Sequence, residues 1–114
     1  MTVNKILMKA LEPIASVQAS TYESYDAEGR TDEVYITFNY STNPDNFGDN
    51  EPDHEVYSVQ VHLFCPASTD SLLIRRDIKN ALRDAGFTFP SSVDATDADG
   101  QHHIFECLIA TEVE

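Results

Sequence analysis

The segment EVYSVQVHLFC, residues 55–65, alternates apolar and polar side chains along most of its length. Successive side chains of a strand point to opposite faces of a sheet, so this alternation predicts a β-strand with one buried face and one solvated face. The predicted buried face carries Tyr57, Val59, Val61, Leu63 and Cys65. The predicted solvated face carries Ser58, Gln60 and His62. Such a strand is typical of an antiparallel sheet that is covered on one face only.

Other segments show the same alternation to different degrees. The clearest is EVYITFNYS, residues 33–41, in which every second residue is apolar and shares one face with Val34. Weaker patterns predict strands within residues 15–22, 87–93 and 102–113. Together with the first segment, these patterns predict four to five strands in a mostly antiparallel sheet.

Two amphipathic helices complete the predicted fold. Residues 2–12 have apolar side chains at helical spacing and Thr2 as a possible N-cap, and residues 70–85 have the same spacing and end before Gly86. Ser68, Thr69 or Asp70 would cap the second helix. We therefore expect one α+β domain over residues 1–114, with both helices packed on one face of the sheet. Its predicted core includes Ile6, Leu7, Ile36, Phe38, Val59, Val61, Ile78, Leu82, Phe105 and Cys107.

The segment VDATDADGQHHIFEC, residues 93–107, is rich in side chains that can bind metals. An EF-hand loop with Gly100 at its sixth position would have Ala95 at its first, where an acidic oxygen is required. Asp99-Gly100 instead suits a tight turn, because both residue types tolerate positive φ. Residues 95–101 are therefore predicted to be the tip of a β-hairpin, and we expect no functional metal there.

Motifs of enzymatic chemistry are missing from the sequence: it has no phosphate-binding loop, no HExxH pattern and no nucleophile elbow. His102 and His103 are neighbours on a predicted strand, so they point to opposite faces and cannot easily share a metal. Surface positions are expected for these two and for His62. Cys65 and Cys107 fall in apolar runs and are expected to be buried free thiols rather than a disulfide. We therefore expect no catalytic residues, no cofactor and no enzymatic activity.

The composition limits the classes of partner. The chain has 114 residues, with 20 Asp and Glu against 7 Lys and Arg, for a net charge of −13. This balance argues against a nucleic-acid-binding surface, which needs a basic footprint. It is compatible with a solvated acidic surface, a mimic of DNA or a surface that repels DNA. The N-terminal segment is typical of an amphipathic helix rather than a signal peptide, so a cytoplasmic protein is expected.

The charges are distributed unevenly along the chain. Six of the seven bases fall on the two predicted helices, and most acids fall in predicted loops. The second helix would carry a basic face made of Arg75, Arg76, Lys79 and Arg83. The ordinary preferences of helices and loops for these residue types explain the pattern equally well.

The connection TNPDNFGDNEPDH, residues 42–54, is longer than the two to five residues usual for a hairpin loop. A connection of this length is either functional or a surface loop without a role. We expect it to line a channel or contact a partner protein. The residues that would do so are Asp45, Phe47, Asp49, Glu51 and Asp53.

The order of these segments resembles a known family. A short helix leads to VYITFNYS, then to an acidic connection, to YSVQVHLFCPASTDSLLIRRDIKNALRDAGF, and through an acidic turn to HHIFECLIATEV. This organisation, from Val3 to Val113, resembles the small tail-terminator (tail-completion) proteins of long, non-contractile-tailed phages and prophages. The residues that carry the resemblance are the strand Tyr57 to Leu63, the helix running into Ala85-Gly86-Phe87, and the acidic-Gly-His entry to the last strand.

The resemblance implies a structural virion protein, assembled in the host cytoplasm and located at the head-proximal end of the tail. Such proteins form a ring, here expected to be a hexamer, which ends tail polymerisation and joins the tail to the head. Its partners would be the tail tube protein and the head connector proteins; DNA would pass without specific binding, and no membrane is involved. An acidic lumen would repel DNA phosphates, and exposed sheet edges could pair between neighbours in a closed ring. The alternatives are a head-completion or connector protein of the phage neck, an acidic DNA-mimic inhibitor, and a small binding module of a non-viral system.

Overall fold

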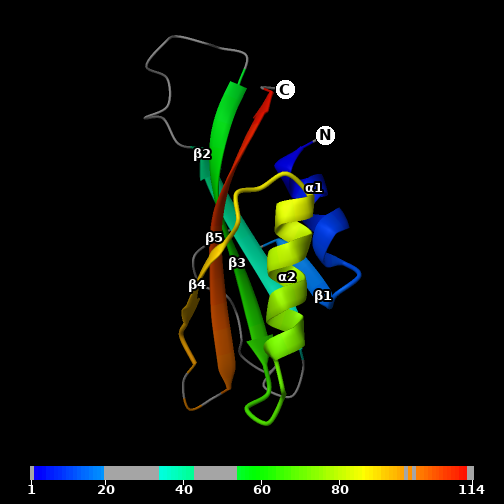
Figure 1. The fold of residues 1–114 in the computed structure, drawn as a ribbon, viewed down its shortest axis with the longest axis vertical. Coiled ribbons are helices and arrows are strands. Elements are labelled where there is room, and N and C mark those ends of the chain that lie inside the picture. The colour runs from blue at the N-terminus through cyan, green and yellow to red at the C-terminus, as the bar shows by residue number, and fades with distance from the viewer. Residues whose placement is uncertain (1, 20–33, 43–53, 97, 99, 113–114) are drawn as a thin grey trace.

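The computed structural model describes residues 2–19, 34–42, 54–96, 98 and 100–112 (Figure 1). Two helices and five strands follow one another along the chain. They are α1 (Val3–Leu11), β1 (Ser16–Ala19), β2 (Tyr35–Thr42), β3 (His54–Cys65), α2 (Leu72–Asp84), β4 (Ser91–Asp94) and β5 (Gln101–Glu112). Both helices lie on the same side of the sheet in Figure 1. No helix in the described part of the chain is long and apolar enough to cross a membrane.

The five strands form one open sheet in the order β1-β2-β3-β5-β4. The β1–β2 pair is parallel and every other pair is antiparallel. The α+β class and the mostly antiparallel sheet predicted from the sequence are therefore confirmed. The central strands β3 and β5 pair over twelve residues, from His54↔Glu112 at one end to Cys65↔Gln101 at the other. In the orientation of Figure 1, we call the first the upper end of the sheet and the second its lower end.

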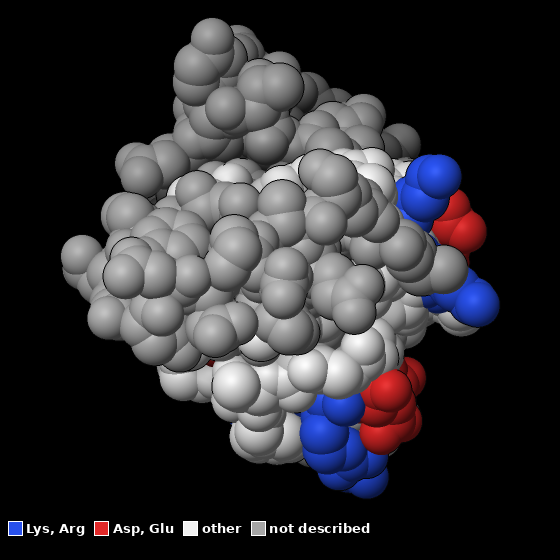
Figure 2. Space-filling view, turned by 90° about the horizontal axis from the view of Figure 1, so that it is seen from above, with Lys and Arg blue, Asp and Glu red and all other residues white. Residues whose placement is uncertain are grey.

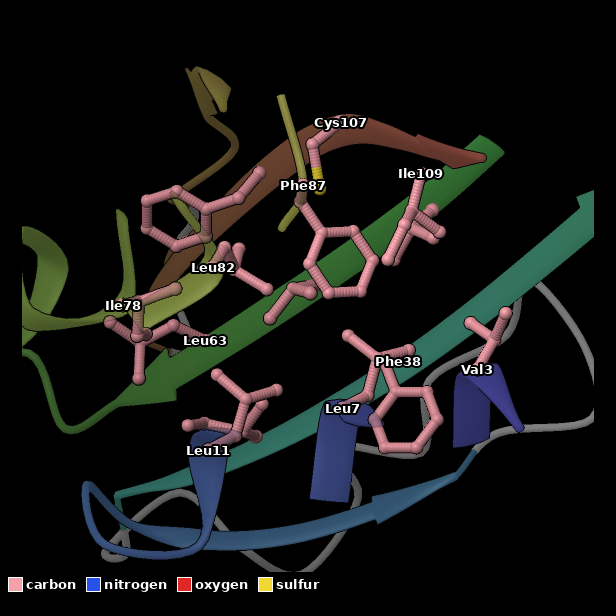
Figure 3. Close-up of a cluster of buried hydrophobic side chains, with 14 of the residues drawn as sticks. Val3, Leu7, Leu11, Phe38, Leu63, Ile78, Leu82, Phe87, Cys107 and Ile109 are labelled. Carbon is pink, nitrogen blue, oxygen red and sulfur yellow. The ribbon is translucent and has the colours of Figure 1, made fainter. Parts of the chain in front are cut away.

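The hydrophobic core lies between the helices and the sheet face that they cover (Figure 3). Both helices contribute one apolar stripe to it, and β2, β3 and β5 contribute alternate residues. Nine of the ten predicted core residues are buried, and the tenth, Ile6, is partly buried and packs against the rest. Burial of each large aliphatic or aromatic side chain contributes about 1.5–3 kcal/mol, so this layer provides most of the stabilisation.

Local signals set the ends of the helices. The Thr2 hydroxyl caps α1 by accepting a hydrogen bond of 3.2 Å from a backbone N–H in the first turn. α2 starts at Leu72 and not at residue 70 as predicted, since Ser71 is its N-cap. The Ser71 side chain makes no capping bond. The Asp70 carboxylate instead accepts a hydrogen bond of 3.3 Å from the Leu72 N–H. Gly86 follows α2 with φ of +105°, a conformation that suits glycine.

The strand predicted at residues 87–93 is shorter than expected and starts later. Phe87 is a core residue rather than a strand residue, because its N–H bonds to the Leu82 carbonyl of α2 at 3.1 Å. Pro90 cannot donate a ladder hydrogen bond, and β4 begins directly after it at Ser91.

Residues 95–101 join β4 to β5, as predicted for a hairpin tip. Gly100 has φ of +148°, and a Cβ at this position would lie 2.9 Å from the main-chain oxygen of Cys65. The turn therefore needs a glycine here to approach the end of β3. Asp97 and Asp99 lie outside the described residues. Within the described ranges, no three His, Cys, Asp or Glu side chains are grouped as a metal site would require.

The sheet face that points away from the helices is only partly solvated, which corrects the prediction of a sheet covered on one face. Near the lower end of this second face, Tyr35, Thr37, His62 and Phe64 are all buried. The Tyr35 and Phe64 rings stack with centroids 4.8 Å apart. The expectation of a surface position is therefore wrong for His62, which is 0% exposed. It is also wrong for His103, which lies on the helix-covered face and is 6% exposed.

Candidate assembly surface

The residues expected to line a channel or contact a partner fall outside the described part of the chain. They are Asp45, Phe47, Asp49, Glu51 and Asp53. The connection that contains them leaves β2 at Thr42 and enters β3 at His54, and both of these residues lie at the upper end of the sheet.

The predicted basic face of α2 is less uniform than its sequence indicates. Arg76 and Arg83 are exposed, whereas Arg75 and Lys79 are half-buried. The guanidinium group of Arg83 pairs with Asp84 at 3.1 Å, and both side chains are more than half exposed. Figure 2 shows acidic and basic side chains side by side on the described surface. The four bases and the two acids Asp77 and Asp84 leave α2 a net charge of +2 (4 − 2), too little to form a binding surface for DNA.

A buried polar network ties the start of α2 to the start of β5 at the lower end of the sheet. The Ser71 hydroxyl donates to Gln101 Oε1 at 2.6 Å and accepts from Arg75 Nε–H at 3.1 Å. His103 Nε2 lies 3.0 Å from the same Gln101 oxygen, and His103 Nδ1 lies 3.9 Å from the Asp94 carboxylate. The Gln101 amide nitrogen donates to the main-chain oxygen of residue 69 at 2.6 Å and to that of residue 66 at 3.2 Å. The network thus fixes the turn between β3 and α2.

A serine, a histidine and an aspartate lie next to one another in space as they do in a hydrolase triad: Ser71, His103 and Asp94. Their hydrogen bonds do not activate the serine. The hydroxyl proton points to Gln101 at 2.6 Å, while the His103 ring nitrogen is 3.5 Å from the serine oxygen. Ser71 is also only 4% exposed, so a substrate has no access to it. Burial, together with the charge of Arg75, lowers the pKa of His103 against the opposite effect of Asp94. The group is therefore a neutral structural support, and no feature of the sequence alone predicts it.

A second histidine contact lies on the opposite face of the sheet. His62 Nδ1 and His102 Nε2 are 3.0 Å apart, across the β3–β5 pair. The His102 ring also stacks on Phe64 with centroids 4.4 Å apart. Burial and the neighbouring imidazole of His102 lower the pKa of His62 to about 4. His62 therefore stays uncharged near neutral pH, and its contact with His102 joins the two central strands.

The two cysteines are free and buried, as expected. Burial raises the pKa of both thiols, that of Cys107 to about 12. A thiolate is the reactive form, so neither sulfur is poised for nucleophilic attack. Cys65 pairs in register with Gln101 while Cys107 lies six positions further along β5, a separation of about 20 Å at 3.3 Å per residue. An intrachain disulfide is excluded by this distance.

A shallow cavity of about 700 Å³ opens on the upper half of the second sheet face, beside the segment that leads into β4. Its lining is mostly uncharged and mixes polar and apolar surface; the single acidic side chain, Glu106, accepts a hydrogen bond of 3.2 Å from Gln60. Phe89 and Leu108 add exposed apolar surface, with 61% and 40% of their side chains exposed. The remaining lining residues are Asn39, Tyr40, Ser41, Ser58, Val59, Thr88, Ser91 and Cys107.

The edges of the sheet differ between its two ends. β1 pairs with β2 only from Tyr35 to Phe38, and β4 pairs with β5 only from His103 to Glu106. Above these positions, the described bonds on the outer side of β5 both involve Thr88. Its N–H donates to the carbonyl of Leu108 at 2.9 Å, and its hydroxyl accepts from the Leu108 N–H at 2.9 Å. The upper part of the described sheet is therefore a three-stranded ribbon of β2, β3 and β5.

The hydrogen-bond pattern shows which main-chain groups face outward on this ribbon. In an antiparallel pair, the N–H and C=O of one residue point to the same side and alternate along the strand. Leu108 points its groups toward Thr88, so those of Ala110 and Glu112 also point away from β3. Ser58 pairs with Leu108 on one side and with Ser41 on the other. Because the Leu108 groups point away from Ser58, the Ser58 groups point toward Ser41. Tyr40 and Thr42, on either side of Ser41, therefore point their main-chain groups away from β3. Within the described residues, no strand pairs with these four positions.

No protein-family model matches the chain, and no curated protein is similar to it in sequence. At the lower end, Ser71, Gln101 and His103 belong to one hydrogen-bonded network, whereas the described upper end offers open strand edges and a groove. This arrangement is suited to binding another polypeptide.

Proposed function

We propose that this chain is a structural protein of a phage or prophage virion. It forms a ring at the head-proximal end of the tail tube, ends tail polymerisation and provides the surface that joins the tail to the head. The proposal starts from the resemblance to tail-terminator proteins. The observation that carries it furthest is the upper end of the sheet, where no described strand pairs with either edge of one ribbon.

Open edges at both sides of one sheet suit a ring. A subunit that offers one edge to each of two neighbours makes a head-to-tail contact, which closes when the rotation between neighbours divides a full turn. The acid-rich connection between β2 and β3 starts and ends at this same end of the sheet. In a ring, its four acids would repeat in every subunit and would repel passing DNA.

The charge pattern supports this function over an acidic DNA mimic. A mimic needs carboxylates on a rigid face, spaced like phosphates. On the described surface of α2, exposed acids alternate with bases, and Asp84 is paired with Arg83. Most other acids fall outside the described helices and strands.

The proposal is tested by removing the gene from the phage or lysogen that encodes the chain and examining the particles by electron microscopy. A tail terminator stops polymerisation, so we expect tails of uncontrolled length without heads, and normal particles when the gene is supplied in trans. Tails of normal length beside filled, tailless heads would indicate the connector alternative. Normal infectious particles from the deletion strain would contradict both.

A further inference from the structure

The groove on the second sheet face has a regular floor. Asn39, Gln60 and Glu106 are partners in register on β2, β3 and β5, so their side chains form one row across the sheet. Neighbours in this row are about 4.8 Å apart. The next row toward the upper end has two serines at the same strands, Ser41 and Ser58. These short side chains leave the hollow above a line of two amides and a carboxylate.

The row has hydrogen-bonding capacity that the fold does not use. The Gln60 amide nitrogen donates to Glu106 Oε2 at 3.2 Å. Within the described part of the chain, no hydrogen bond involves Glu106 Oε1, the Gln60 amide oxygen or the Asn39 side chain. Each of these groups can accept a hydrogen bond. A ligand with several N–H donors in one plane is therefore complementary to the row.

The groove carries a negative charge with no basic side chain near it. Glu106 is the only charged residue of the described lining. All Lys and Arg of the described residues belong to α1 and α2, which lie on the opposite side of the sheet (Figure 1). The whole chain has a net charge of −13. Both the local carboxylate and the field of the protein therefore favour a cationic ligand over an anionic one.

Apolar surface lies beside the carboxylate. Phe89 belongs to the segment that leads into β4, and Leu108 follows Glu106 on the same face of β5; both side chains are exposed. A guanidinium group stacks on an aromatic ring and presents its donors in a fixed plane, whereas an ammonium group is a compact, strongly hydrated charge. The ring, the carboxylate and the amide oxygens together favour arginine over lysine.

We infer that this groove binds an arginine side chain of a partner polypeptide. The guanidinium group pairs with Glu106 and donates to the amide oxygens of Gln60 and Asn39, and the aliphatic stem packs against Phe89 and Leu108. A cavity of about 700 Å³ is in the range of sites for ligands larger than one side chain, so residues next to the arginine fit as well. Binding here does not depend on the proposed role in the tail.

Two peptides that differ only in charge test the site. Each has five residues, with glycine everywhere except at the centre, which is arginine in one and its neutral isostere citrulline in the other. Titration into the isolated protein, followed by amide NMR shifts, should give saturable shifts centred on residues 39–41, 58–60 and 106–108 with the arginine peptide. The citrulline peptide should bind about tenfold more weakly, because it cannot form a charge-assisted bond with the carboxylate.

Three outcomes of the titration would contradict the inference. Equal affinity for the two peptides would show that charge is not recognised. Shifts centred on the helices would place the binding site on the other side of the sheet. Tighter binding of free argininamide than of the arginine peptide would identify a small amine, and not a polypeptide, as the ligand.

A pair of matched variants separates the groove from the overall charge. Glu106→Gln keeps the shape of an exposed side chain and removes its charge, so the arginine peptide should bind about tenfold more weakly. Glu12→Gln makes the same change directly after α1, on the opposite side of the sheet, and should bind the peptide as the wild type does. If both variants weaken binding equally, the attraction comes from net charge alone and the groove is not the site.

The exposed ring supplies an independent test. Phe89→Ala should weaken binding of the arginine peptide about two- to fivefold, the usual contribution of a cation over an exposed aromatic ring. A lysine peptide should bind the wild type more weakly than the arginine peptide, and this preference should shrink in Phe89→Ala. Equal affinity of the wild type for the lysine and arginine peptides would contradict stacking on Phe89. All of these measurements use the isolated chain, so they hold or fail separately from the gene-deletion test.

Discussion

The two ends of the sheet are built for different purposes. At the lower end, β1 and β4 pair with the long strands, Ser71 and Gln101 fix the turn before α2, and His62 contacts His102 across the central strands. At the upper end, the described sheet narrows to three strands with outward main-chain groups on both sides. Ser71 and His103 of the lower end are buried and joined through Gln101, whereas the upper end has an exposed groove.

This difference indicates how the chain combines stability with assembly. A short sheet with both edges open would be marginally stable by itself. Here the open ribbon is an extension of strands whose other halves belong to the packed core, so it keeps its register without flanking strands. Substitutions at the lower end should therefore change the free energy of unfolding, and substitutions at the upper end should change association.

The largest effect is expected in the core. Leu82→Ala should lower the free energy of unfolding by about 2–4 kcal/mol, because the leucine side chain is 0% exposed and its removal leaves a cavity. The matched control on the same helix is Leu73→Ala. Leu73 is 62% exposed, so this substitution should lower the free energy of unfolding by less than about 0.5 kcal/mol. Urea denaturation measures both. Losses of equal size would mean that the buried face of α2 is wrongly assigned.

Acid should weaken the histidine contact of the lower end. His62 has a pKa of about 4 in the folded chain, against an ordinary value of 6.5 in the unfolded chain. Between these pH values the unfolded state binds a proton that the folded state does not. The contribution to stability is therefore complete above pH 6.5 and is lost as the pH falls toward 4, by up to about 3 kcal/mol.

The measurement is the free energy of unfolding at several pH values between 7 and 4. The control is His62→Gln, which removes this titration and leaves His103 and the carboxylates in place. Its stability should depend less steeply on pH than that of the wild type. Parallel pH profiles would contradict the buried, uncharged state of His62.

Replacing a glutamine by alanine should lower the free energy of unfolding by different amounts at the two ends of the sheet. Gln101→Ala at the lower end removes the acceptor of the Ser71 hydroxyl and the donor to the main-chain oxygens of the β3–α2 turn, at a cost of about 1–3 kcal/mol. Gln60→Ala in the groove removes a single exposed contact with Glu106 and should cost less than about 0.5 kcal/mol. Thermal unfolding of both variants ranks them. A more destabilised Gln60→Ala would reverse the comparison between the ends.

The smallest effect on stability, with the largest on function, is expected from the connection between β2 and β3. Deleting residues 45–52 leaves a three-residue link, which is a usual length between antiparallel neighbours. Folding should therefore change by less than about 1 kcal/mol. Under the proposed function, complementation with this variant should yield tails that fail to join heads or fail to eject DNA. Full infectivity of the variant phage would show that these residues have no role in the ring.

Most of the fold could be predicted from local patterns. The alternation in residues 55–65 identified one of the two longest strands and its buried face, and nine of the ten predicted core positions are buried. The strand at residues 87–93 was misplaced because its apolar residues satisfy the same pattern. Phe87 in fact turns into the core at the end of α2.

The candidate site was harder to predict, because its parts are distant in the sequence. The polar network joins Ser71 to Gln101 and His103 across thirty positions or more, and the histidine contact joins residues 62 and 102. The burial of His62 could not be predicted either, since its polar neighbours Ser58 and Gln60 indicate a solvated face. The basic face of α2 was overestimated, because the pairing of Arg83 with Asp84 depends on side-chain geometry.

By itself, the sequence determined the fold class, the helix-covered core, the turn at Gly100 and the acidic character of the chain. These features depend on the period of apolar residues, on backbone conformation and on composition, all of which are local. Only the tertiary structure decided the strand order, the parallel position of β1 and the burial of part of the second face. It also decided that β1 and β4 stop half-way along their neighbours. An open edge exists only where a strand outruns its neighbour in space, so no local pattern can reveal it.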